Sequence, residues 1–187
     1  AMTNGSFYGG LIDKEGNVWA ASRYFHGGVG RVLKVSNDLS TSEVIDAGIP
    51  VYGIALDKYG KIWVTDAYST AFATFNPTDF LGTQKVFYQQ NRGGQSCYAQ
   101  GLAVDDNDNI FIAGCGSAVV GHYKQVVNGN NTGVEFVANY SVSSGPTGVA
   151  VDGKGNVWSS DYGNNAVSRI TLAANPIDAK IEKFDVG

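Results

Sequence analysis

Gly53-Ile-Ala-Leu-Asp-Lys-Tyr-Gly-Lys-Ile-Trp63 occurs in four versions along the 187-residue chain. The other versions begin at Gly9, Gly101 and Gly148, so the leading glycines lie 44, 48 and 47 residues apart. Self-similarity at such a period is typical of arrays that contain one supersecondary unit per copy. The recurrence therefore predicts four copies of one structural unit.

Each copy has the pattern of a β-hairpin. A first apolar run ends in Asp, a polar turn with Gly or Asn follows, and a second apolar run contains a large aromatic residue. Gly and Asn accept the left-handed backbone angles of such turns, and an Asp side chain can cap them. We therefore interpret four aspartates as turn builders: Asp13, Asp57, Asp105 and Asp152.

Two further alternating segments follow each hairpin. The third segments are residues 30–35, 71–75, 119–124 and 166–172, and the fourth are 42–46, 85–88, 135–140 and 180–186. Four strands per copy make an antiparallel meander, which is the blade of a β-propeller. The sequence thus predicts an all-β chain forming a single domain over 1–187, with blades at about 6–48, 49–94, 95–144 and 145–187.

Residue sizes within the copies agree with a propeller. The first strands carry Gly and Ala, as expected where blades converge on a crowded axis. The second strands carry one bulky ring each, which can fill the widening space between blades. We expect these rings to be core residues rather than ligand platforms: Trp19, Trp63, Phe111 and Trp158.

The fourth copy, from Gly145-Pro-Thr-Gly to Trp158-Ser-Ser-Asp161 and on to Asn164-Asn-Ala-Val-Ser-Arg169, resembles a blade of the NHL-repeat and virginiamycin B lyase-like propellers. The resemblance extends over almost the whole chain. Members of these groups usually have six or seven blades, whereas this chain has four copies. Three arrangements therefore stay open: a closed four-blade ring, half of a dimeric assembly, and a fragment of a larger propeller.

Composition excludes some classes of partner. Apolar residues make up 43% and charged residues 16% of the chain, and the net charge is -4. Nucleic-acid binding normally needs a clustered basic surface, so we expect no nucleic-acid partner. No apolar run approaches the roughly 20 residues of a membrane-spanning helix, so we expect no membrane span.

The two cysteines predict a disulfide and a compartment. Cys97 precedes the first strand of the third copy and Cys115 follows its second strand, so a folded hairpin would bring them to the same end of neighbouring strands. A disulfide indicates an oxidising, extracytoplasmic location. The alternative, Cys115 as a nucleophile served by His122, needs an orienting third group that the sequence does not offer.

Asp105-Asp-Asn-Asp-Asn109 begins like a calcium-binding loop. Its sixth position is Ile110 in place of Gly and its twelfth is Gly116 in place of Glu, so the sharp turn and the bidentate ligand are both missing. We interpret this segment as a hairpin turn rich in Asx residues.

Two sets of positions approach one mouth of the channel in a propeller, and this mouth is our candidate site. The residues before the first-strand glycines are Tyr8, Tyr52, Gln100 and Thr147, and those three after the second-strand rings are Ser22, Asp66, Gly114 and Asp161. Four more tyrosines add to this mouth: Tyr24, Tyr68, Tyr98 and Tyr162. Such a mouth suits stacking against sugars or gripping a peptide.

Two functions are consistent with these residues. The first is a non-catalytic, extracytoplasmic module that binds carbohydrate or protein through the channel face without a cofactor, as a homodimer or as part of a larger protein. The alternative is a lyase or lactonase-type hydrolase that uses Mg or Ca with Asp66 and Asp161. In the lyase-like family, His at the first set of positions and Glu at the second hold a magnesium ion, and this chain has neither residue there.

Overall fold

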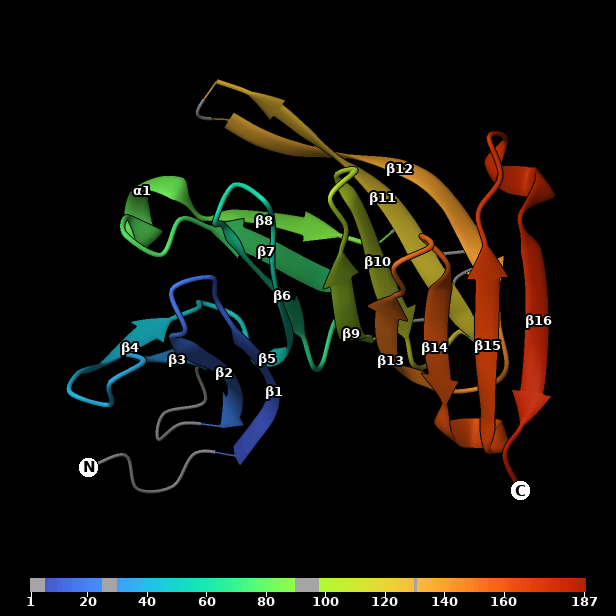
Figure 1. Cartoon of the computed structure of the whole chain (residues 1–187), viewed down its shortest axis with the longest axis horizontal. Helices are drawn as coiled ribbons and strands as arrows, with labels where there is room; N and C mark the ends of the chain where they lie inside the picture. The colour runs from blue at the N-terminus through green and yellow to red at the C-terminus, as the bar shows by residue number, and fades with distance from the viewer. Residues whose placement is uncertain (1–5, 25–29, 90–97, 130) are drawn as a thin grey trace.

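The computed structural model describes residues 6–24, 30–89, 98–129 and 131–187, which form four antiparallel sheets of four strands in simple sequential order (Figure 1). Blade 1 contains β1 (Ser6–Ile12), β2 (Val18–Tyr24), β3 (Arg31–Val35) and β4 (Ser42–Asp46). Blade 2 contains β5 (Val51–Leu56), β6 (Ile62–Asp66), β7 (Ala71–Phe75), α1 (Phe80–Thr83) and β8 (Lys85–Tyr88). Blade 3 contains β9 (Ala99–Val104), β10 (Asn109–Gly114), β11 (Val119–Asn128) and β12 (Asn131–Ser141). Blade 4 contains β13 (Pro146–Val151), β14 (Val157–Asp161), η1 (Tyr162–Asn164), β15 (Ala166–Thr171), η2 (Pro176–Asp178) and β16 (Lys180–Asp185). The predicted four-blade propeller fold is confirmed.

The four sheets form an open arc, in which β1, β5, β9 and β13 are the inner strands (Figure 1). Consecutive inner strands pack side by side along this arc. β1 and β13 lie at its two ends, and among the described residues they do not pack against each other as consecutive inner strands do. The chain alone therefore does not form the closed four-blade ring. The other two predicted arrangements, half of a dimeric assembly and a fragment of a larger propeller, stay open.

Glycines set the spacing of the inner strands. A Cβ built on Gly53 would lie 2.4 Å from the backbone oxygen of Gln100 in the next blade. A Cβ on Gly101 would lie 2.6 Å from the oxygen of Thr147, and one on Gly9 would lie 2.9 Å from the oxygen of Tyr52. Real Cβ atoms are not found so close to backbone oxygens, so only glycine permits this approach. The predicted crowding at the axis is confirmed.

The hydrophobic core consists of three clusters, each between two consecutive blades. Trp19, Trp63 and Phe111 are almost completely buried in them, as predicted. Trp158 is only half-buried, because no described blade follows blade 4, and its ring stacks instead on Phe184 at 6.1 Å between centroids. Trp158 thus has the predicted position on the second strand of its blade, but the prediction that it is buried in the core is wrong.

The four aspartates cap their hairpin turns as predicted. In each turn one carboxylate oxygen accepts hydrogen bonds from two backbone N–H groups, such as those of Tyr59 and Lys61 at Asp57, both at 2.9 Å. The same pattern occurs at the other three: Asp13, Asp105 and Asp152. The turn of Asp105 is therefore a hairpin turn, as we interpreted it.

Blade 3 extends further than predicted. β11 continues from the expected end at Lys124 to Asn128, and β12 begins at Asn131 instead of Glu135. The extra residues pair as a hairpin that protrudes beyond its neighbours in Figure 1. Gly129, with φ of +59°, provides the positive angle of its tip. No helix in the described part of the chain is long and apolar enough to cross a membrane.

Candidate functional site

The first set of predicted mouth residues forms one row across the inner strands. Tyr8 of β1 and Tyr52 of β5 stack with ring centroids 4.9 Å apart and planes 25° apart. Tyr8 is 49% exposed and Tyr52 is half-buried. The pair therefore presents aromatic surface to solvent at the start of two neighbouring inner strands.

Gln100 and Thr147 continue this row on β9 and β13. The backbone oxygen of Gln100 accepts a hydrogen bond from the Thr65 hydroxyl, which also accepts from Gly53 N–H at 2.8 Å. Gln100 Oε1 is buried with no hydrogen-bond partner among the described residues. The Thr147 hydroxyl lies 3.3 Å from Ser160 Oγ. The four residues of the first set thus lie one on each inner strand along the arc, and only Tyr8 and Tyr52 are seen in contact with each other.

The second set does not open onto the mouth. Ser22 and Gly114 are buried, and so are both carboxylates. Asp66 Oδ1 accepts from Tyr68 N–H and its Oδ2 accepts from the Ser69 hydroxyl, both at 2.8 Å. Asp66 therefore caps the turn after β6.

Asp161 is 1% exposed and accepts three hydrogen bonds. Its Oδ1 accepts from the Ser159 hydroxyl at 2.7 Å, and its Oδ2 accepts from the Ser168 hydroxyl and from Ser143 N–H at 3.2 Å. Ser143 lies between β12 and β13, so Asp161 fastens the connection between blades 3 and 4. This role had no signal in the sequence, because the three donors come from three separate segments.

These donor sets do not fit a divalent cation at the axis. Asp66 and Asp161 are two blades apart, and their oxygens face hydroxyl and amide donors rather than one another. Within the described ranges no three His, Cys, Asp or Glu side chains gather into a set that could hold a metal ion. We therefore derive no catalytic step through a metal from these residues.

The additional tyrosines lie in or next to the connections between strands. Tyr68 and Tyr98 are each 43% exposed, and Tyr162, in η1, is 81% exposed. Tyr24 ends β2, but its side chain lies outside the described residues. Their participation in the mouth remains a prediction.

The predicted disulfide is not seen. Cys97 lies outside the described residues, and Cys115 forms no disulfide in the part of the chain that the structure describes. His122 does not serve Cys115, because its Nδ1 lies 3.0 Å from the Tyr140 hydroxyl and its Nε2 lies 3.0 Å from Asn109 Oδ1. Burial lowers the pKa of His122 to about 4, so the ring is neutral at pH 7.

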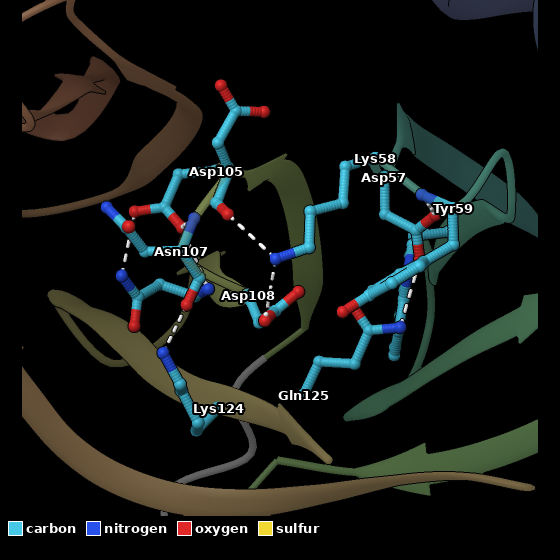
Figure 2. Close-up of polar contacts among 11 residues, drawn as sticks. Asp57, Lys58, Tyr59, Asp105, Asn107, Asp108, Lys124 and Gln125 are labelled. Atoms are coloured by element: carbon cyan, nitrogen blue, oxygen red, sulfur yellow. Dashed lines mark hydrogen bonds and ion pairs between the residues drawn. The ribbon is translucent and has the colours of Figure 1, made fainter. Parts of the chain in front are cut away.

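The opposite end of the arc is held by charged and amide contacts between turns. Figure 2 shows Lys58 reaching from the blade 2 turn to blade 3, where Nζ donates to Asp108 Oδ2 and to Asp106 O, both at 2.9 Å. The hydrogen bond to Asp108 raises the pKa of Lys58. A second hydrogen bond joins the same two blades in the opposite direction: Gln125 of β11 donates from Nε2 to Asp57 Oδ2 at 2.9 Å.

A pocket of about 530 Å³ lies between blades 1 and 2 at this same end. Its lining includes Trp19, Lys34, Tyr59 and Asn76. By strand register the position of Gln125 in blade 3 corresponds to Pro77 in blade 2, and Pro77 also lines the pocket. Proline has no side chain that could reach across to Asp13, so the groove stays open. No pattern in the sequence indicated this pocket, because its lining residues come from two different blades.

Comparison with known proteins supports the fold. No protein-family model matches the chain, and no curated protein matches its sequence. A catalytically inactive virginiamycin B lyase from Staphylococcus aureus, solved with quinupristin, superposes with a TM-score of 0.70 at 15% identity, over 97% of this chain and 56% of the lyase.

Two lactonase structures are similar to the same degree. The periplasmic gluconolactonase of Pseudomonas aeruginosa has a TM-score of 0.73 at 14% identity, over 98% of this chain and 55% of that one. A putative 6-phosphogluconolactonase from Bacteroides fragilis has a TM-score of 0.74 at 10% identity, over 97% and 55%. The chain thus spans about half the length of these propellers, and at such identities the likeness shows the fold alone.

Proposed function

We propose that this chain is a non-catalytic, extracytoplasmic module that binds carbohydrate through the channel face of its propeller arc. The observation that carries the proposal is the stacked, partly exposed pair of Tyr8 and Tyr52 at the start of β1 and β5. Sugar rings present apolar C–H faces that pack on aromatic rings, and tyrosine hydroxyls add hydrogen bonds at the edge.

Polar groups beside the pair can orient such a ligand. Gln100 and Thr147 occupy the equivalent positions on the next two inner strands, and both residues are half-buried. An aromatic platform followed by a few fixed polar groups is the usual composition of a small-molecule site. The extracytoplasmic location is supported by the similarity in fold to a periplasmic enzyme.

A screen of glycans with the intact chain tests this proposal. We expect binding that weakens at least about tenfold in Tyr52→Ala and in Tyr8→Ala but persists in Tyr52→Phe, which keeps the ring. Tyr88→Ala is the matched control, because Tyr88 is exposed on the outer strand β8, which two strands separate from the inner strand β5. Glycan binding that is equal in all four variants would contradict the proposal, as would a ligand found only among peptides.

A metal-dependent lyase or lactonase-type hydrolase is the second candidate, and the fold neighbours favour it at the level of the superfamily. Its test is direct. If this candidate is correct, calorimetric titration with Mg²⁺ or Ca²⁺ will show stoichiometric binding to the chain, and Asp66→Asn and Asp161→Asn will abolish it. We expect no such binding, since both carboxylates are occupied by their own donors.

A further inference from the structure

The blades of this chain use two different faces to pack together. In each pair, the earlier blade contributes the face with the second-strand aromatic ring, here termed the aromatic face. The later blade contributes its opposite face, termed the aliphatic face. In the first pair, Trp19 and Ala21 of blade 1 meet Ile54, Ile62 and Val64 of blade 2.

The other two pairs repeat this relation. The aromatic face of blade 2, with Trp63 and Phe72, packs on Ile110 and Ile112 of blade 3. The aromatic face of blade 3, with Phe111, packs on Val157 and Ile170 of blade 4. Every interface within the chain therefore joins an aromatic face to an aliphatic face.

The aliphatic faces of blades 2, 3 and 4 are each covered by the aromatic face of the blade before them. Among the described residues no blade precedes blade 1, so its aliphatic face has no such cover. By strand register, Val18 corresponds to Ile62 and Val35 to Phe75, both fully buried against blade 1. On blade 1, however, Ile12 is 70% exposed and Val18 is 41% exposed. The face comprises Ile12, Val18, Ala20, Leu33, Val35 and Val44. A contiguous apolar patch of this kind on a soluble protein marks an interaction surface.

Blade 4 has the complementary face. Phe184 is 42% exposed and stacks on Trp158, and the Arg169 guanidinium lies 5.5 Å from the Trp158 ring centre. A cation over the indole does not prevent packing by a following blade, because Lys34 lies over Trp19 at 5.0 Å inside the first interface.

The glycine series also continues in blade 4. Gly9, Gly53 and Gly101 each leave room for a backbone oxygen of the next inner strand, and Gly148 is the fourth member. In this chain a Cβ on Gly148 would meet only Ser160 of its own blade. The space for a neighbouring inner strand is therefore present but not used.

We infer that the aliphatic face of blade 1 docks on the aromatic face of blade 4 in a second copy of the chain. The same contact made in both directions closes two four-blade arcs into one eight-blade ring. Such a head-to-tail contact reuses the interface that already joins the blades within one chain, and a rotation that closes gives a finite assembly. The inference goes beyond the proposed function and does not depend on it, although closure would complete the channel whose mouth contains Tyr8 and Thr147.

The solution mass of the unmodified chain tests this inference by itself. Sedimentation equilibrium is expected to give a mass twice the 19.7 kDa of one chain. A monomer at tens of micromolar would overturn the inference and would leave a further blade of a longer chain as the occupant. Species that keep growing with concentration would overturn it too, since they indicate open head-to-tail fibres.

Two variants test which faces meet. Val18→Glu on the aliphatic face and Phe184→Glu on the aromatic face should each raise the dimer dissociation constant at least about tenfold. Mixing the two variants should restore a one-to-one dimer, because one of its two contacts is then unmodified. Ile177→Glu is the matched control, since Ile177 is exposed and faces the groove between blades 3 and 4. A dimer that resists Phe184→Glu would overturn the inference, because it would show that the aromatic face is not part of the contact.

Discussion

The indole of Trp63 donates from Nε1 to Asp57 Oδ2 at 3.0 Å, and so joins the second strand of the blade to the turn that precedes it. The pairs Trp19 with Asp13 and Trp158 with Asp152 repeat this bond at 2.9 Å. The carboxylate thus caps the turn with one oxygen and positions the ring with the other. The spacing of six residues between Asp and Trp is a requirement of this bond.

Trp63→Phe tests the contribution of the indole N–H where it is buried. Phenylalanine keeps most of the packing but leaves Asp57 with one donor fewer, so we expect a loss of about 1–3 kcal/mol in the free energy of unfolding. Trp158→Phe, at a half-buried ring, should lose less than about 1 kcal/mol. Urea unfolding followed by circular dichroism measures both. Equal losses would show that the burial of this bond does not determine how much it stabilises the blade.

Gln125 replaces a donor that blade 2 lacks. In the other three turns an Asn four residues after the Asp donates its side-chain amide to Oδ2, as Asn17 does at 2.9 Å. Lys61 holds this position in blade 2, and Gln125 of blade 3 supplies the amide instead. Gln125→Ala should therefore cost about 1–2 kcal/mol of stability.

The compensating variant makes this prediction specific. Adding Lys61→Asn to Gln125→Ala provides the local amide found in the other turns and should recover part of the loss. The coupling is read from a double-mutant cycle of urea unfolding. Simple additivity of the two substitutions would refute the exchange of donors.

Gly53→Ala tests the close approach of the inner strands. Its new Cβ would lie 2.4 Å from the Gln100 backbone oxygen, so blades 2 and 3 must separate. We expect a loss of at least about 2 kcal/mol in unfolding free energy. Gly153→Ala is the control, because Gly153 has open space around its Cβ position and no positive φ. There we expect no loss, or a gain of about 0.4–1 kcal/mol. Similar losses at the two positions would disprove the steric explanation.

His122 predicts how stability varies with pH. Its folded-state pKa of about 4 lies below the ordinary value of 6.5. The unfolded chain therefore takes up a proton between these values while the folded chain does not, and stability falls as the pH is lowered from 6.5 to 4. We expect this contribution to be on the order of 1–3 kcal/mol.

Urea unfolding at several pH values measures the His122 contribution. The reference variant is His122→Gln, which keeps polar contacts near Tyr140 and Asn109 but does not titrate. Its stability should change less over this range. An identical pH profile in the variant would mean that other groups, such as the capping aspartates, cause the whole effect.

Local patterns predicted the blades well. The strands β4, β7 and β8 have the predicted limits, because alternation and turn residues mark them clearly. Asp13, Asp57, Asp105 and Asp152 act as expected for the same reason, since every group that they contact in the turn is within a few residues. The hydrogen bonds from Trp158 and Asn156 also hold the pKa of Asp152 well below its usual range.

Relations between blades were less predictable. The role of Asp161 depends on Ser143, which reaches it only after blades 3 and 4 have packed. The pocket beside Trp19 depends on Pro77 in the next blade. The openness of the arc could not be read from the repeat, because each copy carries the same pattern whatever the number of blades in the ring.

Mapping the ligand by NMR tests the central claim most directly. Titration of the labelled chain with a sugar from the screen should shift the amide resonances of Tyr8, Tyr52, Gln100 and Thr147, with little change at the opposite end. Shifts confined to Lys34, Tyr59 and Asn76, around the pocket between blades 1 and 2, would contradict a binding site at the channel mouth.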